Sequence, residues 1–277
     1  MGPPGTVTGV SSTTRSGVSS ALLLGGVAVG AVVVGAMVLV AAWLVLGPGG
    51  PDATVSVGAS APPPESEPDE GWRPWDRNED GRPVRWDPCS PIELVVSPEG
   101  AYPGFRADLE EAAAEVGELA GLEVRVGAEV DERPHGARPL YQPDRYGSRW
   151  APVLVAFAEP HENELPLLDV DHAVAAPVAV GRAGDRTYVS GQVVLNAELA
   201  QERARDEGWP VTLRHELGHL LGLAHVDDEA SLMYPHPQPD ATSWSDGDRR
   251  GLQALGAGGC RDVPDAQPLE VELGPAR

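Results

Sequence analysis

The stretch that decides the fold is HELGHLLGLAH, residues 215–225. On a helix, His215 and His219 lie four residues apart, so both imidazoles leave one face, one turn apart. Two such nitrogens form half of a tetrahedral zinc site. Gly222 tolerates a positive φ, so it can end the helix and turn the chain until His225 supplies a third ligand. Three protein ligands with one open position are the catalytic arrangement of zinc, and the sequence predicts one such ion.

A carboxylate completes this pattern. Glu216 directly follows the first histidine, where it can hold and deprotonate a water instead of binding the metal. The competing interpretation is a buried amphipathic helix whose histidines are hydrogen-bonded in the core. The chain has only 7 histidines, so the coincidence of five fixed positions favours the metal site.

A second motif follows a few residues later, Ser-Leu-Met-Tyr-Pro at 231–235. H-E-x-x-H-x-x-G-x-x-H followed by a Met-turn is the metzincin signature. The chain resembles the metzincin zinc endopeptidases and, within them, the matrixin-like bacterial enzymes. The resemblance covers roughly residues 82–260 and includes Gly-Leu-Gln-Ala-Leu-Gly at 251–256, which is similar to the final matrixin helix. It implies that Met233 forms an apolar floor under the histidines and that Tyr234, directly after it, is structural.

Periodicity and resemblance together predict an α/β (α+β) metzincin-like fold, preceded by one transmembrane helix. Its parts are a twisted mixed sheet with an edge strand, an active-site helix, a Met-turn and a C-terminal helix. The predicted strands are 92–96, 122–126, 152–157, 173–180 and 189–196, and the predicted helices are 105–120, 198–206, 210–221 and 245–255. The last helix opens on Ser245 and Asp248, which resemble a capping box. Residues 127–150 are expected to form a long surface loop.

One strand is a candidate for substrate binding. The apolar segment 173–180 is interrupted by Pro177, which suits the edge of a sheet because proline cannot donate to a ladder. An extended peptide can add itself to such an edge as another strand. In metzincins the substrate binds to an edge of this kind, so Ala173–Ala176 is the candidate docking segment.

The N-terminal region predicts a membrane anchor. Residues 21–46 are uncharged and apolar, and about 20 such residues span a bilayer as a helix. A cleaved signal peptide is the alternative, although this run is longer than an ordinary signal core. The positive-inside rule places the N-terminus in the cytoplasm and the bulk of a single-pass cell-membrane protein outside. The predicted organisation is a disordered cytoplasmic tail (1–20), a transmembrane helix (21–46), a Pro- and acid-rich linker (47–71), a metalloprotease catalytic domain (72–261) and a disordered tail (262–277).

The two cysteines, Cys89 and Cys260, would bracket the catalytic domain near its ends. In an oxidising compartment they predict one disulfide. The alternative is that Cys89 is an inhibitory zinc thiolate, as in the matrixin cysteine switch, but its surroundings do not resemble that motif. Trp72, Trp75 and Trp86 either lie at the membrane interface or pack onto the catalytic domain, and the acidic linker favours packing.

Composition limits the partners. The chain has 42 acidic against 20 basic residues, all of the basic ones arginine, and a net charge of −22. Phosphate binding needs a basic surface, so nucleic acid is not an expected partner. The all-arginine, Ala- and Gly-rich composition suggests a bacterial genome of high G+C content. The expected partners are a protein or peptide substrate and, through one helix, the membrane; a monomer is expected.

The resulting hypothesis is a membrane-anchored, extracytoplasmic zinc endopeptidase. Zinc-activated water attacks the peptide carbonyl, and Glu216 is the general base that returns the proton to the leaving amine. The alternatives are a catalytically silent zinc-containing surface binding protein and the same protease secreted after signal cleavage. Matrixins usually carry calcium and a second zinc, but Asp169–His172 does not reproduce that zinc pattern, and a solvated acidic loop is favoured there.

Overall fold

The computed structural model describes residues 54–57, 71–160, 172–182, 184–202, 208–236, 238 and 240–268. The predicted tail at 1–20, the predicted membrane span at 21–46 and most of the predicted linker lie outside the described residues, as does the end of the C-terminal tail. Among the described residues, no helix is long and apolar enough to cross a membrane. The anchor therefore stays a prediction.

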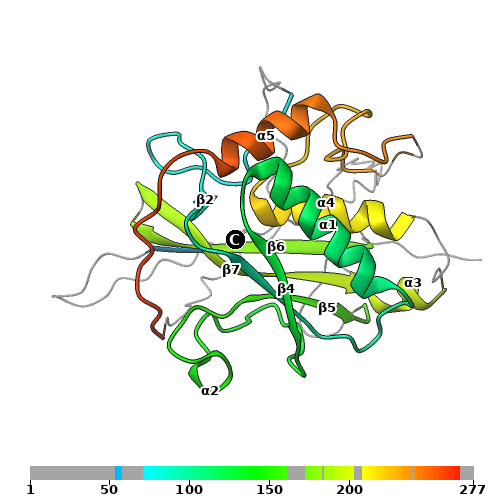
Figure 1. Cartoon of the computed structure of the whole chain (residues 1–277), viewed down its shortest axis with the longest axis horizontal. Helices are drawn as coiled ribbons and strands as arrows, with labels where there is room; N and C mark the ends of the chain where they lie inside the picture. The colour runs from blue at the N-terminus through cyan, green and yellow to red at the C-terminus, as the bar shows by residue number, and fades with distance from the viewer. Residues whose placement is uncertain are drawn as a thin grey trace, which may run out of the picture. The chain divides into compact units, whose positions relative to one another are not determined.

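A single mixed sheet organises the described chain (Figure 1). Its strands are β1 (Thr54–Val57), β2 (Arg85–Trp86), β3 (Ile92–Val96), β4 (Val124–Glu129), β5 (Val153–Ala158), β6 (Ala173–Arg182) and β7 (Asp185–Asn196). The order is β1-β6-β7-β5-β3-β4, with β2 beside β7. β3 pairs in parallel with β4 and β5, and β5 pairs in parallel with β7. β6 is antiparallel to β7, and β1 is antiparallel to β6, which confirms the predicted mixed sheet.

Three helices, α1, α4 and α5, are grouped on one side of this sheet, and the short α2 lies on the other (Figure 1). The helices are α1 (Phe105–Ala120), α2 (Pro143–Tyr146), α3 (Ala197–Glu202), α4 (Gly208–Leu221) and α5 (Asp246–Gly256). Apolar residues recur on α1 at helical spacing, so Leu109, Ala113 and Val116 face the core and are at most 1% exposed. Gly121, with φ 69°, ends this helix by donating its backbone N–H to Glu118 and Gly117. The main core lies between these helices and the sheet.

The prediction of a surface loop at 127–150 is wrong in part. β4 continues to Glu129, and α2 forms at Pro143–Tyr146. The segment between them also buries an ion pair against the sheet: Glu132 and Arg138 are 8% and 9% exposed. A segment buried through an ion pair shows no regular spacing of apolar residues in its sequence. The sequence of this segment therefore looked like that of a solvent-exposed loop.

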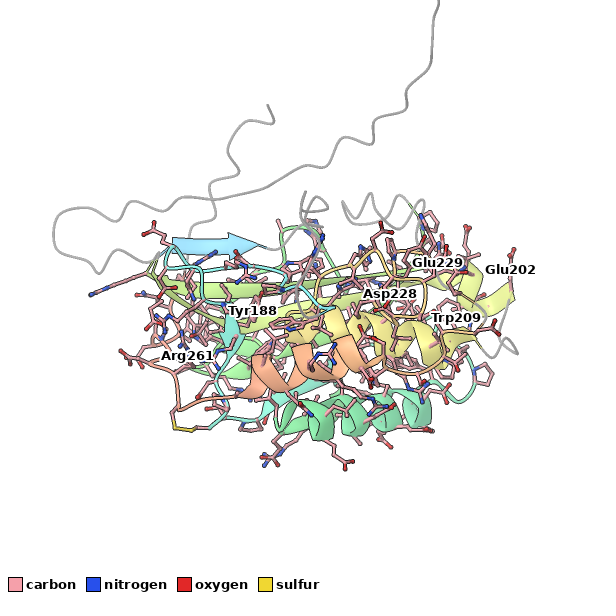
Figure 2. The ribbon with its side chains drawn as sticks, turned by 90° about the horizontal axis from the view of Figure 1, so that it is seen from above. Tyr188, Glu202, Trp209, Asp228, Glu229 and Arg261 are labelled. Atoms are coloured by element: carbon pink, nitrogen blue, oxygen red, sulfur yellow. A yellow bond between two sulfur atoms is a disulfide. The ribbon has the colours of Figure 1, made fainter. Side chains whose placement is uncertain are left out.

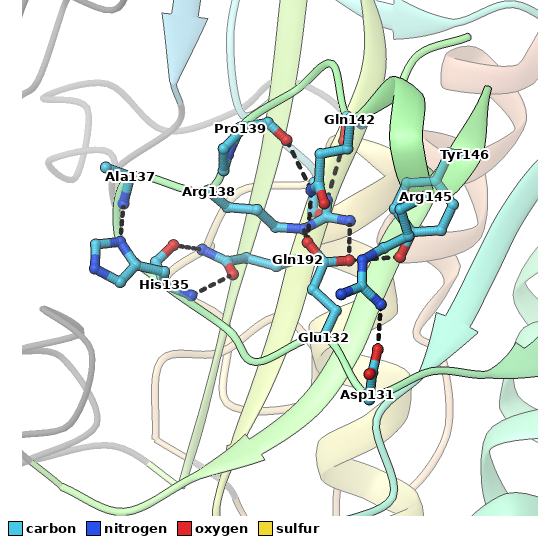
Figure 3. Close-up of polar contacts among 12 residues, drawn as sticks. Asp131, Glu132, His135, Ala137, Arg138, Pro139, Gln142, Arg145, Tyr146 and Gln192 are labelled. Atoms are coloured by element: carbon cyan, nitrogen blue, oxygen red, sulfur yellow. Dashed lines mark hydrogen bonds and ion pairs between the residues drawn. The ribbon is translucent and has the colours of Figure 1, made fainter. Parts of the chain in front are cut away.

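Figure 3 shows the contacts of this pair. The Arg138 guanidinium donates twice to the Glu132 carboxylate, at 2.8 and 3.0 Å, and once to the Gly191 carbonyl at 3.0 Å. Gln142 and Tyr146 donate to the same carboxylate. Burial by itself raises the pKa of Glu132, but hydrogen bonds and the Arg138 charge bring it below its ordinary value. The carboxylate therefore stays ionised and ties the segment to β7.

β1 also departs from the prediction, because it forms inside the segment 47–71 that was expected to be a spacer. Its residues Thr54–Val57 pair with Val178–Gly181 of β6. The predicted edge strand is therefore covered over its second half. Ala173–Pro177, which contains the candidate docking segment, pairs only with β7 among the described residues.

The ends of the catalytic region are tied together as predicted. Cys89 and Cys260 form a disulfide with Cα atoms 5.2 Å apart. The two thiols are therefore not available to hold a metal, and the inhibitory role considered for Cys89 is excluded in this state. The Asp87 carboxylate accepts from the backbone N–H groups of Cys89 and Arg261 at the same place. Beyond it, Trp150 Nε1 donates to the Pro264 carbonyl at 2.9 Å, which holds the first residues of the C-terminal tail.

The three tryptophans pack onto the domain, which confirms that interpretation. Trp86 is 7% exposed, and its Nε1 donates to the Leu220 carbonyl near the end of α4 at 2.8 Å. Trp72 packs against the main core beside Gly251 of α5. Trp75 lies against the ring of His219.

Replacing the disulfide should destabilise the fold. Cys89 and Cys260 are 171 residues apart, and closing a loop of that size removes entropy from the unfolded chain worth about 5 kcal/mol. We expect Cys89→Ser/Cys260→Ser to lower the free energy of unfolding by about 3–5 kcal/mol in chemical denaturation. A reductant should lower the stability of the parent to the same level and leave the variant unchanged. A loss below about 1 kcal/mol would contradict a structural role.

Breaking the buried ion pair should cost more than breaking an exposed one. Arg138→Leu leaves the Glu132 carboxylate buried without its charge partner, so the free energy of unfolding should fall by about 3–5 kcal/mol. Arg149→Leu is the matched control, because Arg149 pairs with Glu93 at the surface and should cost at most about 1 kcal/mol. Equal losses of unfolding free energy in urea for the two variants would show that the buried ion pair contributes no more to stability than the exposed one.

Candidate metal centre

The helix α4 presents the first two histidines. Pro210 lies in its first turn, where the missing N–H costs no helical hydrogen bond. Leu213, Leu217 and Leu220 are fully buried and form the core-facing side of α4, and Leu220 reaches Gly191 of β7. The opposite side of the helix carries His215 and His219, four residues apart.

A sharp turn then brings the third histidine back. Gly222 has φ 110°, a conformation that residues with a Cβ rarely adopt. The backbone N–H groups of Gly222 and Leu223 donate to the His219 and Gly218 carbonyls, each at 2.9 Å, and close the end of α4. The chain reverses and places His225 beside the other two rings. The turn predicted from the glycine is confirmed.

The three imidazoles converge through their Nε2 atoms. His225 Nε2 lies 3.2 Å from His215 Nε2 and 3.1 Å from His219 Nε2. Three nitrogens bound tetrahedrally at about 2.0–2.1 Å from one zinc ion lie about 3.3–3.4 Å apart. The spacing of the donors therefore fits one zinc ion. Among the described residues, the one other group with metal-ligating atoms this close is Asp87 with the two disulfide-bonded cysteines.

Backbone carbonyls orient two of the rings. His215 Nδ1 lies 2.7 Å from the Leu232 carbonyl oxygen, and His219 Nδ1 lies 2.8 Å from that of Leu223. A carbonyl only accepts, so Nδ1 carries the proton and the Nε2 lone pair faces the common point. This tautomer is the one a metal requires.

Burial favours neutral imidazoles. Desolvation lowers the pKa of His215 and lowers that of His219 well below its ordinary value. The pKa of His225 falls to about 4, first through burial and then through the neighbouring imidazoles. At neutral pH all three rings are therefore uncharged and can act as metal ligands.

Met233 packs against α4 at Gly218, between the two helical histidines. It is 1% exposed, and its carbonyl accepts from Val226 N at 3.1 Å. Its sulfur packs so closely on α4 that a Cβ at Gly218 would lie 2.7 Å from it, and the Trp244 ring would lie 3.1 Å from the same Cβ. Gly218 is thus the residue between the two helical histidines that allows the Met-turn to approach. The sequence analysis did not single it out, although its place inside the motif was a usable signal.

Asp248 has a wider role than the predicted helix cap. The capping box with Ser245 is present, and Asp248 is fully buried. Its carboxylate also accepts from the Ser231 hydroxyl at 2.6 Å and from Leu232 N at 2.9 Å. Because the Leu232 carbonyl accepts from His215 Nδ1, one carboxylate on α5 holds the backbone N–H of the residue whose carbonyl orients His215. The motif pointed to Asp248, but only the fold showed the second contact.

The segment after the linker supports the third ligand. Trp75 N donates to the Gly222 carbonyl at 2.6 Å, and Ala224 N donates to the Arg73 carbonyl at 2.8 Å. The Trp75 ring meets the His219 ring edge-on, with centroids 4.9 Å apart. These contacts brace the turn that carries the chain to His225. No sequence pattern indicated them, because they join segments about 150 residues apart.

The remaining residues considered in the sequence analysis are Tyr234 and those of the segment Asp169–His172. Tyr234 is half-buried, and its ring lies 5.9 Å from the exposed His236. His172 is exposed and near Trp209, with ring centroids 6.4 Å apart. Asp169–Asp171 lie outside the described residues, so the acidic-loop interpretation stays a prediction.

Comparison with known proteins agrees with this site. Residues 157–256 match the family model for matrixin. No curated protein matches the chain. Among solved structures, archaemetzincin from Methanopyrus kandleri matches with 20% identity over 58% of this chain and 92% of that chain, at a TM-score of 0.34.

The span that matches matrixin contains the three histidines, Glu216, the Met-turn and α5. The resemblance inferred from the motif is therefore confirmed. Over residues 157–256 the chain is thus similar to the matrixins, which are metzincin-type zinc metallopeptidases.

Filling the space at Gly218 should weaken the site. In Gly218→Ala the new Cβ meets Met233 Sδ and Trp244, so the Met-turn must shift away from α4. We expect a loss of about 1–3 kcal/mol in unfolding free energy and a zinc affinity about tenfold lower or worse, measured by competition with a chromogenic chelator. Gly259→Ala is the control, because a Cβ there has nothing within 4 Å. Equal zinc affinity in both variants would show that this contact does not position the ligands.

Proposed function

We propose that the protein is a zinc-dependent endopeptidase in which His215, His219 and His225 hold the ion and Glu216 is the general base. The observation that carries the proposal is the convergence of three neutral Nε2 donors at one point. Glu216 follows the first ligand on the same helix and is 5% exposed. A binding protein needs the ligands but has no use for this carboxylate.

The chain's own groups account for the proton transfers. A zinc ion in this site would polarise the scissile carbonyl and make a water more acidic. Glu216 then takes the proton of the attacking water and delivers it to the nitrogen of the leaving amine. The surrounding core keeps this carboxylate largely dry, which strengthens its interaction with the proton it carries.

A substrate peptide would bind along the edge of β6. Ala173–Pro177 pairs with β7 on one side, and no strand covers its other side within the described residues. A peptide that adds there as an antiparallel strand makes backbone hydrogen bonds irrespective of its side chains. From the resemblance to matrixins, we propose that the stretch between the Met-turn and α5 contributes a wall for the residue after the cleaved bond.

We also propose that the enzyme is anchored by residues 21–46 with its catalytic domain outside the cell, and that it acts as a monomer. The apolar run supports the anchor. The disulfide supports an oxidising compartment, because cytosolic thiols stay reduced. Membrane fractionation with N-terminal sequencing tests the anchor: recovery of a soluble form that begins after residue 46 would favour secretion instead.

Removing the general base should abolish turnover and spare the metal. We expect Glu216→Gln in the full-length protein to retain one zinc per chain, because a carboxylate beside the ligands is not itself a ligand. Peptide hydrolysis should fall by about 10²–10⁴-fold. The measurement is cleavage of a quenched-peptide library with zinc content determined in parallel.

Two further variants serve as the negative and positive controls for the role of Glu216. Glu229→Gln changes an exposed carboxylate on the loop after His225 and should keep full activity. His225→Ala should lose zinc as well as activity. A zinc-loaded, folded parent that cleaves no library peptide would overturn the peptidase assignment and favour a zinc-containing binding protein.

A further inference from the structure

The candidate docking edge is shorter than the strand that provides it. β6 pairs with β7 from Ala173 to Arg182, but its other side carries β1 at Val178–Gly181. Peptide binding at this edge is part of the proposed function. Whether β1 limits the length of a bound peptide depends on where the metal centre lies along β6.

Two contacts place α4 relative to β6. At the start of the helix, Trp209 lies beside His172, with ring centroids 6.4 Å apart. Near its end, Leu220 Cδ1 lies 3.2 Å from the Cβ position of Gly191, the residue that pairs with Pro177. Eleven residues of helix and five residues of strand both span about 16 Å, so the two elements run side by side in the same direction.

This alignment sets the level of the metal centre. His215 and His219 lie about 9 and 15 Å along α4 from Trp209. The matching levels on β6 run from about Ala175 to Pro177. The residue Val178, where the pairing with β1 begins, is therefore only one or two strand positions beyond the ligands.

The direction of β1 is that of an antiparallel substrate. A peptide antiparallel to β6 runs from the level of Gly181 toward Ala173, and Thr54–Val57 runs the same way. Figure 2 shows the light-blue arrow of β1 pointing toward the side of the molecule where Asp228 and Glu229 are labelled, on the loop that follows His225. β1 thus occupies the stretch of edge that the N-terminal part of a long substrate would use.

We propose that β1 is a built-in stop that closes the binding groove on the N-terminal side of the substrate. About one or two residues before the cleaved bond can pair with β6 ahead of Val178. A longer peptide must displace β1 from Val178–Gly181 or turn away from the sheet. The preferred substrates are therefore peptide segments with a short extended stretch before the cleaved bond. This inference rests on the proposed peptide binding at the same edge.

Peptides of different length test the stop in the full-length protein in detergent micelles. They share one bond cleaved from the quenched library and carry two, four or six residues before it. In the parent, kcat/KM should not rise beyond the shortest peptide. In Val55→Pro/Ser56→Pro, prolines remove backbone donors of β1 and open the edge. The longest peptide should then gain about fivefold or more, mainly through KM, because new backbone hydrogen bonds form.

A matched control tests whether two prolines in the linker have an effect of their own. Glu65→Pro/Ser66→Pro places two prolines in the same linker outside β1 and should behave as the parent. Hydrogen exchange at Val178–Gly181 reports directly whether β1 has been released. Released β1 with the same length dependence as the parent would overturn the proposal.

A binding measurement separates this proposal from the peptidase assignment. The same peptides, fluorescently labelled, are titrated into Glu216→Gln with and without the proline pair in β1, and Kd is measured by anisotropy. A length-dependent gain in affinity on release of β1 supports the stop even if no peptide is cleaved. Cleavage of all peptides with no gain in affinity or kcat/KM overturns the stop while the peptidase assignment stands.

Discussion

Three imidazoles, that of His219 buried and those of His215 and His225 partly buried, must meet at one point, each with an unprotonated nitrogen. Backbone carbonyls satisfy this constraint for two of the rings, because the oxygens of Leu232 and Leu223 accept hydrogen bonds from the Nδ1–H groups of His215 and His219. Burial then keeps the rings neutral. The Met-turn must be near α4 to supply the first of these carbonyls, and Gly218 provides the space. Much of the surrounding architecture serves this approach.

The supports of the site come from distant parts of the chain. Asp248 on α5 holds the Met-turn, Trp75 braces the turn after α4, and Trp86 caps the end of α4 through the Leu220 carbonyl. The disulfide joins the segment that follows Trp86 to the end of α5. The disulfide therefore links the segment 72–86, which contains Trp75 and Trp86, covalently to the region of α5, which carries Asp248.

Metal ligation and peptide docking depend on one alignment, that of α4 with β6. The core holds α4 alongside β6, so His215 and His219 lie at about the level of Ala175–Pro177 along the strand. The edge beyond that level is occupied by β1. Within the described residues, the outer side of β6 is thus paired with β1 at Val178–Gly181 and carries no strand at Ala173–Pro177. The proposed substrate binding and its proposed limit both depend on this division of one strand.

The amino-acid sequence by itself determined the convergence of the three histidines, the turn at Gly222, the α1 helix and the strand at Ile92–Val96, because each depends on residues close in sequence and on a regular spacing. The disulfide followed from the presence of only two cysteines. The tertiary structure alone decided the contact of Asp248 with the Met-turn, the buried Glu132–Arg138 pair and the pairing of β1 with β6. These contacts join groups that are far apart in the chain. They are made by polar side chains and backbone groups, which produce no regular spacing of residues in the sequence.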